Sequence, residues 1–182
     1  MQAKQKTKPY DYFDPVFDGS YEVPIDTEYD LPDYCPDIQK VLKCKVMPEI
    51  SSYGVSDGTL RCQGVCDIRV LYVDAKGDSL RCCEFTKEFS ASIKVKSCEE
   101  QAVAFIRASV EHMTCRAVNA RRIDLHMAVT LKALAVVQRQ EQITCDLEGE
   151  GVQRLGEHKT ASQAVNAISH VFTVEDRIPL KN

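Results

Sequence analysis

The strongest alternation of hydrophobic and polar residues lies in residues 122–138, which read RIDLHMAVTLKALAVVQ. Every odd position from Ile123 to Val137 is apolar, and the even positions up to Lys132 are polar apart from one alanine. Apolar residues at every second position line one face of a β-strand, whereas on a helix they would spread around the cylinder. The pattern therefore predicts a strand with one buried face. Because strands of this length are uncommon, we also expect a bend or bulge near Leu134.

Similar patterns predict further strands, which occupy residues 46–55, 60–72, 80–95 and 101–116. The second of these has a predicted buried face made of Leu60, Cys62, Gly64, Cys66, Ile68, Val70 and Tyr72. Asp57 and Gly58 are typical of a tight hairpin, and Asn119 begins the turn into residues 122–138. Such strands and turns predict an all-β fold, an antiparallel β-sandwich. Towards the C-terminus we expect a hairpin about residues 149–151, a short helix or irregular segment at 160–169 and a last strand at 170–179.

One short helix is predicted near the N-terminus, from Pro36 to Cys44. Proline suits the first helical position, and Asp37 suits the first turn. The apolar residues that follow form a one-sided stripe at helical spacing, consisting of Ile38, Val41 and Leu42. We expect this helix to cap one open end of the sandwich.

Residues 1–37 have a different composition, because the stretch from Pro9 to Asp37 is rich in aromatic and acidic residues and lacks Lys and Arg. Its prolines forbid a helix and disfavour a central strand. We interpret residues 1–37 as an extended N-terminal arm, followed by a β-sandwich domain at 38–182. The arm residues expected to dock on a protein surface are Tyr10, Tyr12, Phe13, Phe17 and Tyr21. Two docking modes remain open, since the arm can pack on its own domain or add a strand to a neighbouring subunit.

Charge and hydropathy exclude several classes of protein. The net charge is −4 and no strongly basic face is evident, which argues against nucleic-acid binding. No apolar run approaches the length of a membrane span. The basic first residues, MQAKQKTK, are not followed by an apolar segment, so we expect no signal peptide and a cytoplasmic site of synthesis.

The chain contains nine cysteines, an odd number that disfavours a closed intramolecular disulfide framework in a protein without a secretion signal. No CxxC pair occurs, which argues against the usual zinc and redox motifs. Buried reduced thiols are one interpretation, and intermolecular disulfides in an assembled structure are the other. The candidates for intermolecular disulfides are Cys35, Cys82, Cys83 and Cys98.

Several catalytic motifs are absent, since the sequence has no Walker loop, HExxH or GxGxxG. His112 and His126 lie on opposite sides of the Asn119 turn, where they could face each other, but two histidines without a defined partner are more often surface residues. The aspartate spacing of the arm matches no EF-hand loop. We therefore expect a protein that is not an enzyme and holds no cofactor or metal.

Four short motifs resemble those of a known family. Leu31 to Ile38, LPDYCPDI, resembles its proline-aspartate-isoleucine motif, and Gly64 to Val73, GVCDIRVLYV, resembles its glycine-led strand. The two others are Asn119 to Ile123, NARRI, and Glu88-Phe89-Ser90. The family is the domain of unknown function in SipL-type spore proteins of clostridia, where it usually precedes a LysM domain. The resemblance extends over residues 20–180.

The resemblance implies a morphogenetic role in the spore coat. It places the protein in the mother-cell cytoplasm and then in the coat or at the spore surface. In that family the LysM domain recruits a coat-scaffold ATPase, and because this sequence shows no LysM segment we do not expect recruitment by that route. Residues 172–180, FTVEDRIPL, resemble the opening strand of a second family repeat, which favours head-to-tail association.

Two hypotheses for function follow. In the first, the protein is a structural subunit of the endospore envelope that binds copies of itself or other coat proteins by β-strand addition, with disulfide cross-links as a further option. In the alternative, it is a monomeric adaptor or ligand-binding domain that recruits a coat scaffold protein. The sequence does not identify the partner.

Overall fold

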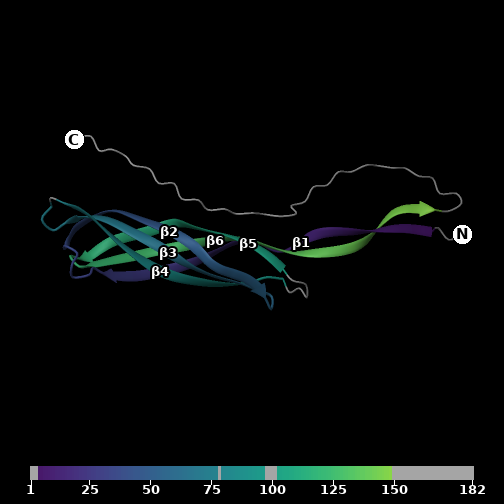
Figure 1. Cartoon of the computed structure of the whole chain (residues 1–182), viewed down its shortest axis with the longest axis horizontal. Coiled ribbons are helices and arrows are strands. Elements are labelled where there is room, and N and C mark those ends of the chain that lie inside the picture. Colours follow the sequence, from purple (N-terminus) through teal and green to yellow (C-terminus); the bar gives the residue numbers. More distant parts are fainter. Residues whose placement is uncertain (1–3, 78, 97–101, 149–182) are drawn as a thin grey trace, which may run out of the picture.

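The computed structural model describes residues 4–77, 79–96 and 102–148. Within these ranges the chain forms two antiparallel sheets of three strands each, in the orders β1-β6-β5 and β2-β3-β4 (Figure 1). The strands are β1 (Lys4–Asp30), β2 (Ile38–Ser56), β3 (Thr59–Asp74), β4 (Leu80–Lys94), β5 (Ala102–Asn119) and β6 (Arg122–Glu148). The prediction of an all-β, antiparallel fold is confirmed. The predictions for residues 149–179 lie outside the described residues.

The predicted helix at residues 36–44 is wrong, because Ile38 begins β2 and pairs with Asp74 of β3. Near the start of β2 the β2–β3 register shifts twice, leaving Gln39 and Leu42 as extra residues. These two bulges bring inward-facing residues to a spacing of three, so Ile38 is buried and both Val41 and Cys44 are half-buried against the core. A spacing of three is also the helical repeat, which explains why the sequence pattern indicated a helix.

Strand β6 is the central strand of the first sheet. Its buried and exposed residues follow the period of two that the sequence shows. All eight odd positions from Ile123 to Val137 are buried. The expected irregularity lies in its partner strand, since the β1–β6 register shifts between Pro15 and Phe17. The extra residue, Val16, is buried and packs with Leu60 and Ile93 of the second sheet, Ala135 of β6 and their neighbours.

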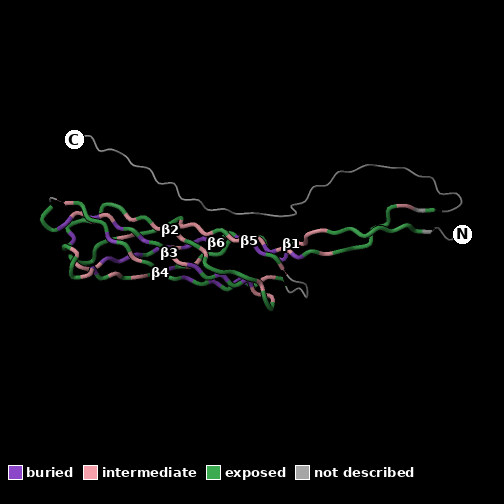
Figure 2. The backbone as a smooth tube through the Cα atoms, viewed as in Figure 1, coloured by how far each residue is buried: buried purple, intermediate pink, exposed green. Residues whose placement is uncertain are grey.

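The two sheets face each other, as the layers of a β-sandwich do, and two clusters of buried residues each draw side chains from both sheets. The larger cluster of buried residues combines Leu125 and Leu131 of β6 with Ile68 and Val70 of β3. The predicted inward face of β3 is confirmed, since all seven of its residues are buried. Figure 2 shows the buried positions concentrated in this body. At one side of the body, β2 lies beside β5, so the edges of the two sheets meet there.

Candidate assembly surface

Strands β1 and β6 continue together beyond the body of the domain. The pairing of β5 with β6 ends at Ala102 opposite Val137, whereas β1 stays paired with β6 as far as Lys4 opposite Glu148. We call residues 4–14 of β1 and 138–148 of β6 the outer ribbon, which projects from the body in Figure 1. Among the described residues, no third strand pairs with the outer ribbon. Strand edges of this kind expose backbone N–H and C=O groups that can pair with another chain.

The outer ribbon is held by contacts within β1 and between its two strands. Within β1 the Tyr10 and Tyr12 rings stack with centroids 6.1 Å apart, and across the ribbon the Tyr12 hydroxyl donates a hydrogen bond to Glu141 Oε1 at 2.8 Å. This hydrogen bond to a carboxylate raises the pKa of Tyr12. The Arg139 guanidinium lies 3.1 Å from Asp14 Oδ2. Most positions of the ribbon are exposed, as the tube in Figure 2 shows, so its stability does not come from a core.

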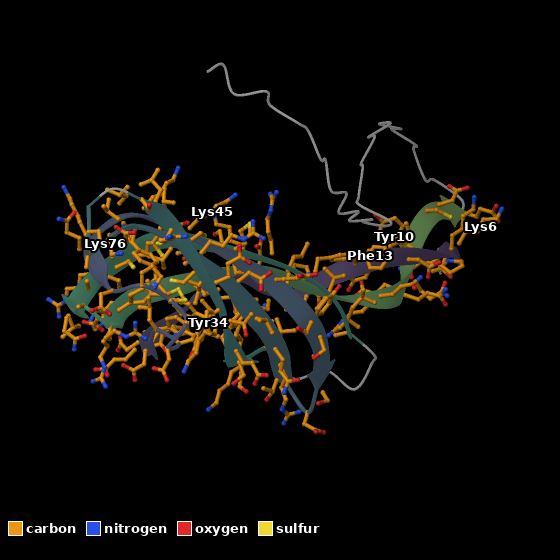
Figure 3. The ribbon with its side chains drawn as sticks, turned by 60° about the vertical axis from the view of Figure 1, so that its left-hand side comes forward. Lys6, Tyr10, Phe13, Tyr34, Lys45 and Lys76 are labelled. Atoms are coloured by element: carbon orange, nitrogen blue, oxygen red, sulfur yellow. The ribbon has the colours of Figure 1, made fainter. Side chains whose placement is uncertain are left out.

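The arm residues selected from the sequence lie along β1 but not in one environment. Tyr10 and Phe13 lie on the outer ribbon, where both are labelled in Figure 3, and Tyr10 is 43% exposed. Phe17 packs against the core at the start of the body, and Tyr21 is exposed opposite Leu131. Residues 4–30 are therefore extended and paired with the chain's own β6. The prolines are accommodated because β1 is an edge strand of its sheet.

The cysteines fall into buried and exposed groups. Of the four selected from the sequence, Cys82 is exposed, Cys35 is half-buried, Cys83 is buried and Cys98 lies outside the described residues. Burial raises the pKa of Cys83 to about 11, which keeps its thiol protonated near neutral pH. Cys145, which sequence reasoning did not select, is exposed on the outer ribbon, and its Sγ lies 3.2 Å from the Lys6 carbonyl oxygen. Cys145 is the extra residue where the β1–β6 register shifts between Lys6 and Thr7, so the period of two provides no signal for its position.

Two of the four sequence motifs meet at the connection between the sheets. The Arg121 guanidinium donates hydrogen bonds to the carbonyl oxygens of Leu31, Pro32 and Cys35, at 2.9, 2.8 and 2.6 Å. It also lies 3.1 Å from Asp37 Oδ1. Backbone bonds fix both ends of the loop to the β5–β6 turn, one from Leu31 N to Arg121 O and one from Ile38 N to Ala120 O, each 2.8 Å long. This arginine sets the path by which the chain leaves the first sheet and enters the second.

The other two motifs meet inside the second sheet. Gly64 of β3 lies opposite Phe89 of β4 in the strand register. A Cβ atom at Gly64 would lie 2.4 Å from both the Phe89 ring and the Glu49 carbonyl oxygen. The phenylalanine ring therefore fills the space that a side chain at Gly64 would need. Contacts within the fold therefore account for both pairs of motifs, and no ligand is needed to explain them.

A protein-family model described as SipL, SPOCS domain, matches residues 37–118. Residues 37–118 are therefore similar to a SPOCS domain of the SipL type. The matched residues comprise β2, β3, β4 and most of β5, so the match is shorter than the resemblance over residues 20–180 suggested. No curated protein and no solved structure matches the chain.

The SPOCS match connects residues 37–118 with the spore coat, whereas β1 and β6 lie entirely outside the matched residues. These two strands complete the first sheet and form the outer ribbon. Across the part of the chain that is described, no helix is long and apolar enough to cross a membrane. The same residues contain no group of three or more His, Cys, Asp or Glu side chains placed to hold a metal ion.

The two histidines near the Asn119 turn do not face each other. In the β5–β6 register His112 lies opposite Ala128, and His126 lies opposite Thr114. His126 instead contacts two carboxylates, with Nδ1 2.7 Å from Asp26 Oδ1 and Nε2 3.0 Å from Asp124 Oδ2. These hydrogen bonds raise the pKa of His126, with the bond to Asp26 as the larger cause. The network joins β1 to β6 on the outer face of the first sheet.

Proposed function

We propose that the protein is a structural subunit of the spore coat and that subunits associate through the outer ribbon by β-strand addition. The SPOCS match supports the connection with the spore coat. The observation that carries the assembly step is the continuation of β1 and β6 past the last paired residue of β5. The proposed role is structural rather than catalytic, and it requires no cofactor.

The outer ribbon suits strand addition for an energetic reason. A two-stranded ribbon is marginally stable in water on its own, whereas a third strand would satisfy one row of backbone groups and cover one edge. Tyr10 and Ile143 are exposed apolar residues on this ribbon, at 43% and 45%, and they would lose water contact against a neighbour. The occupant we propose is a second copy of this chain.

The geometry of the contact decides the shape of the assembly. The outer ribbon lies at one end of an elongated molecule, and the turn between β5 and β6 lies at the other end of the body (Figure 1). If a ribbon pairs with a different edge of the next subunit, the contact does not close, and it produces filaments or sheets. Exposed thiols at Cys82 and Cys145 could then form cross-links between subunits once the surroundings become oxidising.

A pair of matched double variants tests this proposal. Tyr10→Lys with Ile143→Lys places charges on the outer ribbon, and Met113→Lys with Leu42→Lys places the same charges on the body, at positions 42% and 46% exposed. Light scattering with size-exclusion chromatography should show multimers for the native chain and for the body variant. The ribbon variant should be monomeric, with an unchanged circular dichroism spectrum.

Salt dependence separates the proposal from the adaptor alternative. Pairing of backbone groups should survive high salt, whereas binding of a partner through the acidic residues of β1 should weaken as salt screens the charges. A native chain that is monomeric at every concentration would contradict assembly and favour the adaptor. A ribbon variant that assembles as well as the native chain would exclude the outer ribbon as the connector.

A further inference from the structure

We propose that Cys44 and Cys115 form an intramolecular disulfide that joins the two sheets when the protein meets a low-molecular-weight disulfide such as oxidised glutathione. The two residues lie on β2 and β5, the strands that meet where the edges of the sheets lie side by side. The inference is independent of assembly through the outer ribbon. It concerns a pair of cysteines that the sequence did not connect.

The strand geometry places the two cysteines at the same level. The starting point is the backbone bond between Ile38 and Ala120, which is 2.8 Å long. Cys44 lies six residues along β2 from Ile38, with two bulge residues between them, and Cys115 lies five residues back along β5 from Ala120. One bulge residue, Val118, falls within that second interval. When the bulge residues are left out of the count, Cys44 and Cys115 lie the same number of residues from the Ile38–Ala120 hydrogen bond.

Both side chains face the same interior. Cys44 lies opposite Val70 of β3, and Cys115 lies opposite Leu125 of β6, and these two partners are fully buried core residues. Both cysteines are half-buried and pack against the core cluster that the two sheets share. They are therefore close to each other and still partly accessible to a small oxidant. A bond between them would connect two sheets that have no strand ladder between them.

The hydrogen bond between the thiols makes the pair chemically asymmetric. It lowers the pKa of Cys115 and raises the pKa of Cys44. Cys115 is therefore the thiol that more readily becomes the thiolate, which is the attacking species in thiol–disulfide exchange. The neighbouring thiol of Cys83 has a pKa raised to about 11 by burial and stays protonated.

The reaction takes place in two exchanges. The Cys115 thiolate attacks one sulfur of oxidised glutathione, forming a mixed disulfide and releasing one glutathione thiolate. The Cys44 thiol loses its proton to solvent, and its sulfur attacks the Cys115 sulfur, which releases the second glutathione thiolate. The two protein thiols are oxidised, and one glutathione disulfide is reduced to two glutathione thiols that take up the two protons.

Peptide mapping of the full chain tests the proposal. The reduced protein is incubated with oxidised glutathione, free thiols are alkylated, and digestion after acidic residues releases Cys44 and Cys115 on separate peptides, 38–49 and 112–124. The expected result is a cross-linked pair of these two peptides with simultaneous loss of both thiols. The thermal midpoint of the oxidised protein should exceed that of the reduced protein, because the bond restricts the unfolded chain.

Single variants test the order of reaction. Cys44→Ser should accumulate one glutathione on Cys115, whereas Cys115→Ser should leave Cys44 unmodified over the same time. Cys145→Ser, at an exposed position on the outer ribbon, should form the cross-link as the native chain does. If a variant does not fold, the peptide map of the native chain alone tests the proposal. Retention of both thiols while Cys82 and Cys145 acquire glutathione, or linkage of Cys44 to a different cysteine, would overturn the proposal.

Discussion

Replacement of Arg121 by alanine tests the connection between the sheets. The side chain contacts the loop at residues 31–37 through three carbonyl oxygens, and it is 35% exposed. Alanine would leave these carbonyl oxygens without their charged donor and would remove the ion pair with Asp37. The loop carries the chain from β1 to β2, so its release should reduce the stability of both sheets.

The magnitude can be worked from these contacts. A hydrogen bond to a charged group contributes about 1.5–3 kcal/mol when it is buried. Since the side chain is partly solvated, we take about 1 kcal/mol for each of the three carbonyl bonds, which gives a loss of about 3 kcal/mol in the free energy of unfolding. For a domain of this size, that loss lowers the thermal midpoint by roughly 6–12 °C.

The assay is thermal unfolding followed by circular dichroism, with the adjacent arginine as control. Arg122 forms ion pairs with Glu28 and Asp30 at 3.2 and 2.7 Å, and within the described residues its side chain donates hydrogen bonds to Asp30 rather than to the loop carbonyl oxygens. Arg122→Ala should therefore unfold close to the native temperature. Arg121→Lys should lose most of the stability that alanine loses, because an ammonium group cannot reproduce the planar fork. Equal midpoints for the two alanine variants would refute this reasoning.

Two further predictions concern the body of the domain. Gly64→Ala should lower the free energy of unfolding by about 1–3 kcal/mol in a denaturant titration, because its Cβ would meet the ring across the strand, and Gly54→Ala, with nothing within 4 Å of its Cβ, should have little effect. An equal decrease in the free energy of unfolding for Gly64→Ala and Gly54→Ala would contradict the packing argument. His126 has its pKa raised by Asp26 and Asp124, so the stability it provides is complete below the unfolded pKa of about 6.5 and is lost as pH rises through the folded pKa. His126→Gln should flatten the decline in stability above about pH 6.5, and parallel pH profiles for the two proteins would exclude this role.

The sequence predicted those strands whose side chains follow a strict period of two. The buried faces of β3 and β6 were correct residue by residue, because each strand has core on one side along residues 60–72 and 123–137. The start of β2 was predicted wrongly, since bulges at Gln39 and Leu42 produce a helical spacing in a strand. Such bulges depend on the partner strand, so a local pattern does not reveal them.

Contacts between distant parts of the chain were not predictable from the sequence. The carbonyl oxygens bound by Arg121 are 86 to 90 residues away in sequence. The pairing of Cys44 with Cys115 likewise depends on which sheet edges meet, and spacing along the chain contains no signal for that. The pairing of β1 with β6 was left open because proline and alternating aromatic residues fit both an arm and an edge strand.

Hydrogen exchange of the outer ribbon is the most direct test of assembly by strand addition. Backbone amides of residues 4–14 and 138–148 are compared between dilute monomer and assembled protein. Strand addition predicts that exchange in the outer ribbon slows on assembly, because its edge groups become hydrogen-bonded to a neighbour. Equal exchange of the outer ribbon in both states, with new protection confined to the body, would contradict the central claim.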